Sequence, residues 1–193
     1  MNPEIKIDGR KIGVDHPPYI IAEMSANHNG SIDRAINIIE AAKESGADAV
    51  KIQTFTADTI TIDFNSSDFI IKSGLWKDKN LYDLYNEAHT PWEWHEKLVA
   101  KAKEIEISLF SSPFDFSAVN FLETLNIPAY KISSFEIVDI PLIERVSATG
   151  KPLIISTGMA SLNEITLAVE TASNSNLKDL ALLHCVSGYP TPA

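Results

Sequence analysis

The chain has 193 residues, 45% of them hydrophobic, which is enough for one sizeable core and favours a single domain. Its formal net charge of −10 disfavours binding to nucleic acids or anionic membranes, although a few cations gathered in one pocket could still bind an anion. One cysteine excludes an intrachain disulfide framework, and no apolar run approaches the roughly 20 residues of a membrane span. With no signal-peptide core at the N-terminus, we expect a cytoplasmic protein.

The first segment, residues 1–18, contains "EIKIDGRKIG", which predicts a short hairpin that turns at Asp8 and Gly9. From residue 19 onward, strand-like and helix-like segments alternate. The expected strands cover residues 19–24, 48–53, 107–112, 129–134, 152–157 and 180–185.

Helical patterns with polar first residues separate these strands. The expected N-caps are Ser31, Thr90, Asp115 and Ser161. Pro91 follows Thr90 and suits the first helical position, so we expect a helix to begin there. Residues 54–90 interrupt the regular spacing as a polar insertion, with "LYDLYNEA" helical near its end.

Repeated strand–helix units predict a parallel sheet. No GxGxxG or GxxxxGK[ST] motif follows a strand, which argues against the nucleotide-binding open sheets. A (β/α)8 TIM barrel fits better, but it needs eight strands and about 250 residues, and this chain supplies six strands. We therefore expect an incomplete TIM barrel over residues 19–193, as a piece of a longer protein.

Polar side chains collect where the expected strands end, which is where active sites form in such barrels. Four of them carry charge: Glu23, Lys51, Lys131 and Glu136. Charged groups at strand ends are rarely buried without a partner, so these four favour a functional role. Two lysines among hydroxyl groups suit a phosphate or carboxylate, and a nearby carboxylate suits proton transfer. The lysines could equally form Schiff bases, and spacing does not separate the two options.

Two of the five histidines, His28 and His184, could contribute to a metal site. His28 and His184 lie at the ends of strands, whereas His16, His89 and His95 are expected at the surface or on helices. Because no close His/Asp/Glu triplet occurs, we expect no complete metal site within this chain.

Four further residues have structural interpretations. Cys185, on an apolar strand, is expected to be a packed core thiol. Trp76, Trp92 and Trp94 are expected to pack the insertion and the helix that follows it.

Several motifs, in order, resemble the sialic acid synthase family. They are "IIAEMSANHNGSIDRAINIIEAAKESGADAVKIQTF", "FSSPFD", "IPAYKISSFEIVDIPLIERV", "GKPLIISTGMA" and "LLHCVSGYPTPA". The Trp-rich stretch "FIIKSGLWKDKNLYDLYNEAHTPWEWHEKL" is most similar to the pseudaminic acid synthase branch. The resemblance implies condensation of phosphoenolpyruvate with an N-acyl amino sugar, 2,4-diacetamido-2,4,6-trideoxy-altrose in that branch, by C–O cleavage.

The resemblance also implies roles for individual residues. Glu23 and Glu136 would be catalytic, and Gln53 and Tyr189 would contact the sugar. The residues implied for phosphoenolpyruvate are Lys51, Ser112, Lys131, Ser134 and Ser187.

Further implications concern what lies outside this chain. The family uses Mn²⁺ or Mg²⁺, with ligands expected beyond residue 193, and the full-length protein is expected to form a homodimer. We therefore expect this chain to be inactive alone. The alternatives are an N-acetylneuraminate or legionaminate synthase, a Schiff-base aldolase, and a binding or assembly module without catalysis.

Overall fold

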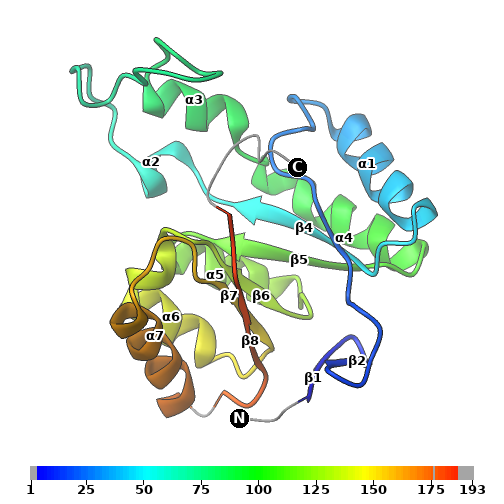
Figure 1. Cartoon of the computed structure of the whole chain (residues 1–193). Helices are drawn as coiled ribbons and strands as arrows, with labels where there is room; N and C mark the ends of the chain where they lie inside the picture. The colour runs from blue at the N-terminus through cyan, green and yellow to red at the C-terminus, as the bar shows by residue number, and fades with distance from the viewer. Residues whose placement is uncertain (1–3, 176, 187–193) are drawn as a thin grey trace.

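The computed structural model describes residues 4–175 and 177–186. Within these residues, a two-stranded antiparallel hairpin precedes a six-stranded sheet (Figure 1). The strands are β1 (Glu4–Ile7), β2 (Arg10–Gly13), β3 (Ile21–Glu23), β4 (Ala49–Thr54), β5 (Ser108–Pro113), β6 (Tyr130–Ile132), β7 (Leu153–Ser156) and β8 (Leu180–Leu183). The hairpin turns as predicted, at Asp8 and Gly9, both with positive φ.

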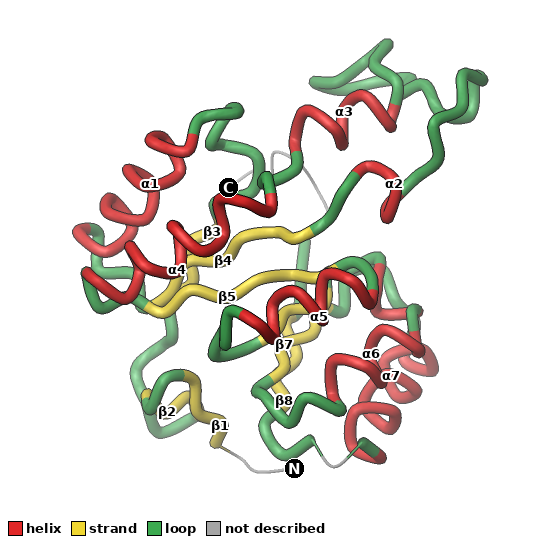
Figure 2. Tube along the Cα trace, turned by 180° about the vertical axis from the view of Figure 1, so that it is seen from behind, coloured by secondary structure: helices red, strands yellow, loops and turns green. Residues whose placement is uncertain are grey.

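The large sheet is parallel throughout, and its strand order β3-β4-β5-β6-β7-β8 follows the chain. All six predicted strands are present, with ends within two residues of those expected. The sheet curls, and helices cover its outer face (Figure 2). Six neighbouring parallel strands with helical crossovers on one side form part of a closed (β/α)8 barrel, so the predicted incomplete barrel is confirmed.

Seven α-helices occur in the described residues. They are α1 (Ile32–Glu44), α2 (Ala57–Ile60), α3 (Leu81–Ala88), α4 (His95–Glu104), α5 (Phe116–Thr124), α6 (Ile140–Ser147) and α7 (Leu162–Asn174). Ser31, Asp115 and Ser161 cap α1, α5 and α7 as predicted, each accepting a backbone N–H bond. No helix in the described residues has the length and apolar character needed to cross a membrane.

The predicted helix start at Thr90 is wrong. Pro91 has a ψ of 132°, which is extended rather than helical. A 3₁₀ turn (Trp92–Trp94) follows, and the α-helix begins at His95. The Thr-Pro pair matches a local capping pattern. However, the ring of His95 hydrogen-bonds to the carbonyl of Pro91, and this contact stabilises a different start of the helix.

The insertion between β4 and α4 contains α2 and α3, which lie beyond the C-terminal end of β4 (Figure 1). The predicted packing of its tryptophans is wrong for Trp76, which is 47% exposed. The other two tryptophans pack as predicted: Trp92 donates its Nε1–H to the Phe55 carbonyl of the insertion over 3.3 Å, and Trp94 packs against the core that includes α4. Trp92 also stacks on Phe121 of α5, with ring centroids 4.8 Å apart, and Trp94 meets His28 edge-on at 5.4 Å.

The hairpin closes the opposite end of the sheet (Figure 1). Ile7 is fully buried, and it packs with side chains from three strands and the residue before β6: Ala49, Phe110, Ile154 and Ala129. These residues form an apolar floor inside the curled sheet. Arg10 pairs with Asp48, and Ser108 Oγ donates to Asp8 Oδ2 over 2.7 Å, so polar contacts at the rim hold the hairpin against the floor.

A buried polar chain joins β4, β5 and the start of α4. His95 lies on a helix, at the start of α4, which is one of the two positions expected for it, and its side chain is fully buried. Its Nδ1–H donates to the Pro91 carbonyl over 3.2 Å, and the Thr54 hydroxyl donates to Nε2 over 2.8 Å. Ser111 Oγ then donates to Thr54 Oγ1 over 2.7 Å. The neutral imidazole therefore satisfies every member of the chain, and burial lowers the pKa of His95 to about 4.

This burial predicts acid sensitivity. Between pH 6.5 and 4, His95 binds a proton in the unfolded protein but not in the folded protein. The free energy of unfolding therefore falls as the pH falls through this window. The contribution is on the order of 3 kcal/mol. We expect urea unfolding at pH 4.5, 5.5 and 6.5 to give a shallower pH dependence for His95→Gln than for wild type. His184→Gln, at an exposed histidine that is not part of this hydrogen-bonded chain, should keep the wild-type slope; equal slopes in all three proteins would contradict the assignment.

Candidate active site

Alternation along β4 explains the position of its two polar residues. Val50 and Ile52 point outward into a core with α1 and α4. Lys51 and Gln53 therefore point to the inner face, above the apolar floor. Gln53 pairs in register with Ser112 of β5, so these two side chains share that face.

Lys51 forms an ion pair with Glu23 of β3, its register partner. Its Nζ also lies 3.5 Å from Ser112 Oγ. The backbone N–H of Ser25 donates to Glu23 Oε1 over 3.0 Å, which holds the carboxylate from the loop after β3. The lysine on this inner face thus has a carboxylate partner and a neighbouring hydroxyl.

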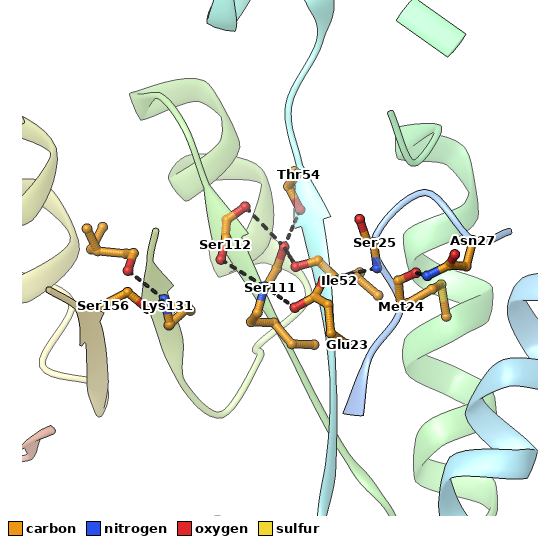
Figure 3. Close-up of polar contacts among 12 residues, drawn as sticks. Glu23, Met24, Ser25, Asn27, Ile52, Thr54, Ser111, Ser112, Lys131 and Ser156 are labelled. Carbon is orange, nitrogen blue, oxygen red and sulfur yellow. Dashed lines mark hydrogen bonds and ion pairs between the residues drawn. The ribbon is translucent and has the colours of Figure 1, made fainter. Parts of the chain in front are cut away.

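Lys131 lies on β6, two strands from Lys51, and is 6% exposed. Its Nζ donates to Ser156 Oγ over 2.5 Å and to the Ile132 carbonyl over 2.7 Å (Figure 3). Burial, and then repulsion from Lys51, lower the pKa of Lys131 to about 8. Two ammonium groups that repel each other inside a sheet favour an anionic ligand between them.

Ser156 of β7 is a residue that sequence reasoning missed. It contacts Lys131 directly, and its inward position follows from alternation with the floor residue Ile154. That alternation, together with the "STG" strand end, is the signal that would have identified it.

Ser134 follows β6 and lies against Gly158. A Cβ on Gly158 would stand 2.5 Å from Ser134 Cβ, and the φ of Gly158 is +49°. Glycine is therefore required here both by close approach and by backbone conformation.

Cys185 is half-buried, so its predicted role as a packed core thiol is wrong. It follows β8, the last strand of the described sheet, where less of the chain covers it. Burial acts to raise the pKa of its thiol, but Ser156, the Gly158 N–H and Lys131 together bring that pKa below its ordinary value.

Glu136 begins the 3₁₀ turn Glu136–Val138 after β6. Its Oε2 is buried without a hydrogen-bond partner among the described residues. Burial raises the pKa of this carboxyl, although nearby Lys131 acts in the opposite direction. Glu136 and Lys131 act on each other electrostatically, each favouring the charged form of the other, whereas Ser187 and Tyr189 lie outside the described residues.

No three His, Cys, Asp or Glu side chains gather as a metal site in the part of the chain that the structure describes. His28 is fully buried, and its Nδ1 accepts the Gly30 N–H over 3.2 Å. His184 is exposed. The described residues therefore do not provide the ligand set that the family resemblance implies.

Comparison with known proteins identifies the family to which this chain belongs. The profile of the NeuB family matches residues 38–193. This chain belongs to the NeuB family. It is 47% identical to a pseudaminic acid synthase of Helicobacter pylori over 91% of this chain, and 37% identical to an N,N'-diacetyllegionaminic acid synthase of Legionella pneumophila over 98% of it.

The chain spans about half of each of these relatives, 52% and 55% respectively. The crystal structure of an N-acetylneuraminic acid synthetase from Leptospira borgpetersenii superposes with a TM-score of 0.84 at 30% identity, covering 98% of this chain and 61% of that one. The NeuB-family chain thus shares its curled sheet with a solved member of the sialic acid synthases.

The contact between Gly158 and Ser134 predicts a specific cost of substitution. Gly158→Ala should lower the unfolding free energy by about 2 kcal/mol, because Ser134 Cβ must move and the backbone is strained. Gly150→Ala has the same kind of strain, with φ +73° and open space around the new Cβ, and should cost about 1 kcal/mol. Urea unfolding of both variants checks this; equal costs would show that the close approach has no energetic effect.

Proposed function

We propose that the complete gene product is a pseudaminic acid synthase. It would condense phosphoenolpyruvate with 2,4-diacetamido-2,4,6-trideoxy-altrose and water, giving pseudaminic acid and phosphate. The pseudaminic acid synthase relative, at 47% identity, supports this substrate over those of the more distant relatives. The observation that carries the proposal is the pair of inward-facing lysines, because a dianion is the ligand that their mutual repulsion favours.

Lys131 is the clearest anion-binding residue. Within the described residues, its ammonium donates to a hydroxyl and a carbonyl but forms no ion pair, so its charge is left without a counter-ion. In the proposed complex, Lys51 and Lys131 hold the phosphate and carboxylate of phosphoenolpyruvate. The hydroxyls of Ser112 and Ser134 assist, with Ser156 added from the structure and Ser187 from the sequence.

Glu23 is the proposed base toward the sugar, with Gln53 and Tyr189 as further contacts. Its carboxylate accepts a proton from a sugar hydroxyl as the ring opens to the aldehyde. C3 of phosphoenolpyruvate then attacks the aldehyde carbon, and the aldehyde oxygen becomes the new hydroxyl group. Water adds to the cationic C2, and the tetrahedral intermediate breaks its C–O bond to release phosphate. In the proposal Glu136 lies beside these carbons, takes a proton from the attacking water and passes it to the former aldehyde oxygen, and the water's second proton leaves with the phosphate.

Divalent metal and dimer formation stay predictions. A bound Mn²⁺ or Mg²⁺ would polarise the sugar aldehyde. Because the described residues offer no ligand set for it, the steps above rely on side chains alone.

The function is tested with the complete gene product by phosphate release from phosphoenolpyruvate in the presence of Mn²⁺. We expect strong preference for the diacetamido trideoxy sugar over N-acetylmannosamine. Preference for N-acetylmannosamine would change the assignment to an N-acetylneuraminate synthase. A legionaminate precursor is tested as the third sugar, and preference for it would change the assignment to a legionaminate synthase. Release with none of these sugars would contradict the family's reaction for this protein.

A second candidate is a Schiff-base aldolase. The lowered pKa of Lys131 beside Lys51 favours it, because an amine near another cation is more readily neutral and nucleophilic. Borohydride reduction in the presence of pyruvate, followed by mass spectrometry, separates the two. A stable adduct on Lys131 would favour the aldolase, since the proposed synthase forms no imine.

The Lys131 pKa of about 8 predicts how phosphoenolpyruvate binding depends on pH. A bound dianion favours the ammonium form, so Kd should rise as the pH increases through 8, by up to about tenfold per pH unit. Calorimetry at pH 7, 8 and 9 measures this. Lys131→Met should bind weakly at every pH, whereas Lys97→Met, on the exposed face of α4, should follow wild type. A constant wild-type Kd from pH 7 to 9 would remove Lys131 from the binding site.

A further inference from the structure

A cavity of about 210 Å³ lies at the C-terminal end of the sheet. It is formed by the segments that follow three consecutive strands, β4, β5 and β6. Its lining residues are Thr59, Ile60, Phe114, Phe135, Glu136 and Asp139. The insertion therefore supplies one wall, through α2, and the loop that carries the proposed catalytic Glu136 supplies another.

The polar groups of this cavity differ in how they are satisfied. The Thr59 hydroxyl donates to the Thr56 carbonyl over 3.0 Å within α2, and Asp139 Oδ1 accepts the Leu142 N–H over 3.0 Å at the start of α6. Glu136 Oε2 has no such partner among the described residues, although it is buried. A buried carboxylate oxygen without a partner is destabilising, so a ligand that hydrogen-bonds to it would be favoured.

The other walls are apolar. Ile60, Phe114 and Phe135 line the cavity, and Phe135 is 69% exposed at its rim. Phe114 is held by an edge-to-face contact with Phe55, with ring centroids 5.3 Å apart. An exposed aromatic ring beside an unsatisfied carboxyl provides one apolar and one polar contact for a small group.

Charge restricts the ligand further. No lysine, arginine or histidine lines the cavity, while two acidic residues do. A phosphate or carboxylate would therefore be repelled, and the dianionic substrate is better placed between Lys51 and Lys131. A neutral group with both an N–H donor and a methyl group fits all these features.

We propose that this cavity binds an acylamino substituent of the sugar substrate, which makes Ile60, Phe114 and Phe135 specificity-determining residues. The amide N–H donates to Glu136 Oε2, and the acyl methyl packs against Phe135 and Ile60. The inference rests on the proposed function in that its ligand is an N-acyl amino sugar. It also assigns a role to the insertion, since α2 sets the depth available to the acyl chain.

The test uses the complete gene product and the diacetamido trideoxy sugar, whose two acetyl methyl groups give separate NMR signals. In saturation-transfer difference spectra, one methyl should receive strong saturation from wild type and at least threefold less from Phe135→Ala. Because Phe135 is largely exposed, this variant should fold. Phe116→Ala, at an exposed phenylalanine outside the cavity, is the matched control and should leave both signals unchanged.

Kinetics of phosphate release provide the second measurement. Phe135→Ala should raise the KM for the sugar about tenfold and change the KM for phosphoenolpyruvate by less than twofold. Turnover by wild type with no effect of Phe135→Ala on either measurement would overturn the subsite and leave the proposed function intact. Phe135-dependent saturation without turnover would support the subsite while contradicting the function. Absence of saturation at both methyl groups in wild type would overturn the subsite.

Discussion

Two ammonium groups on the inner face of a curled parallel sheet are the constraint around which this molecule is organised. Lys51 is balanced by Glu23, whereas Lys131 contacts a hydroxyl and a carbonyl but no carboxylate in the described structure. Burial and repulsion lower the pKa of Lys131, so the unliganded fold bears the cost of a charge that an anionic substrate would offset. Such a cost is typical of binding sites, where stability and function oppose each other.

The sheet can hold these charges because the N-terminal ends of its strands are apolar inside and the C-terminal ends are polar. At one end the hairpin inserts Ile7 among Ala49, Phe110 and Ile154, which gives the interior a dry floor. At the other end the strands finish in hydroxyls, amides and charges. Parallel register places all these ends together, so residues far apart in the chain, such as Glu23 and Ser156, face the same space.

The segments beyond the strands position this polar end. The buried chain from His95 through Thr54 to Ser111 ties the start of α4 to β4 and β5, on the outer side of the strands that carry Lys51 and Ser112. Thus α4, which follows the insertion, is attached to the outer face of the sheet behind the candidate site. At the beginning of the insertion, α2 lines the cavity at the C-terminal end of the sheet. The insertion thus begins and ends at the candidate site, which suits the specificity role proposed for α2.

The sequence alone determined the positions of the strands, the helices with strong caps and the strand-end cluster that contains Lys51 and Lys131, because period-2 alternation and N-cap residues are local signals. Family motifs identified further candidate residues. Only the tertiary structure decided which groups are paired. Local patterns predicted a buried Cys185 and a helix starting at Pro91, and both were wrong because missing cover and distant partners determine burial and helix starts. They placed His95 at the surface or on a helix but gave no sign of its complete burial. The contact of Ser156 with Lys131 and the unsatisfied oxygen of Glu136 likewise depend on neighbours that no stretch of sequence contains.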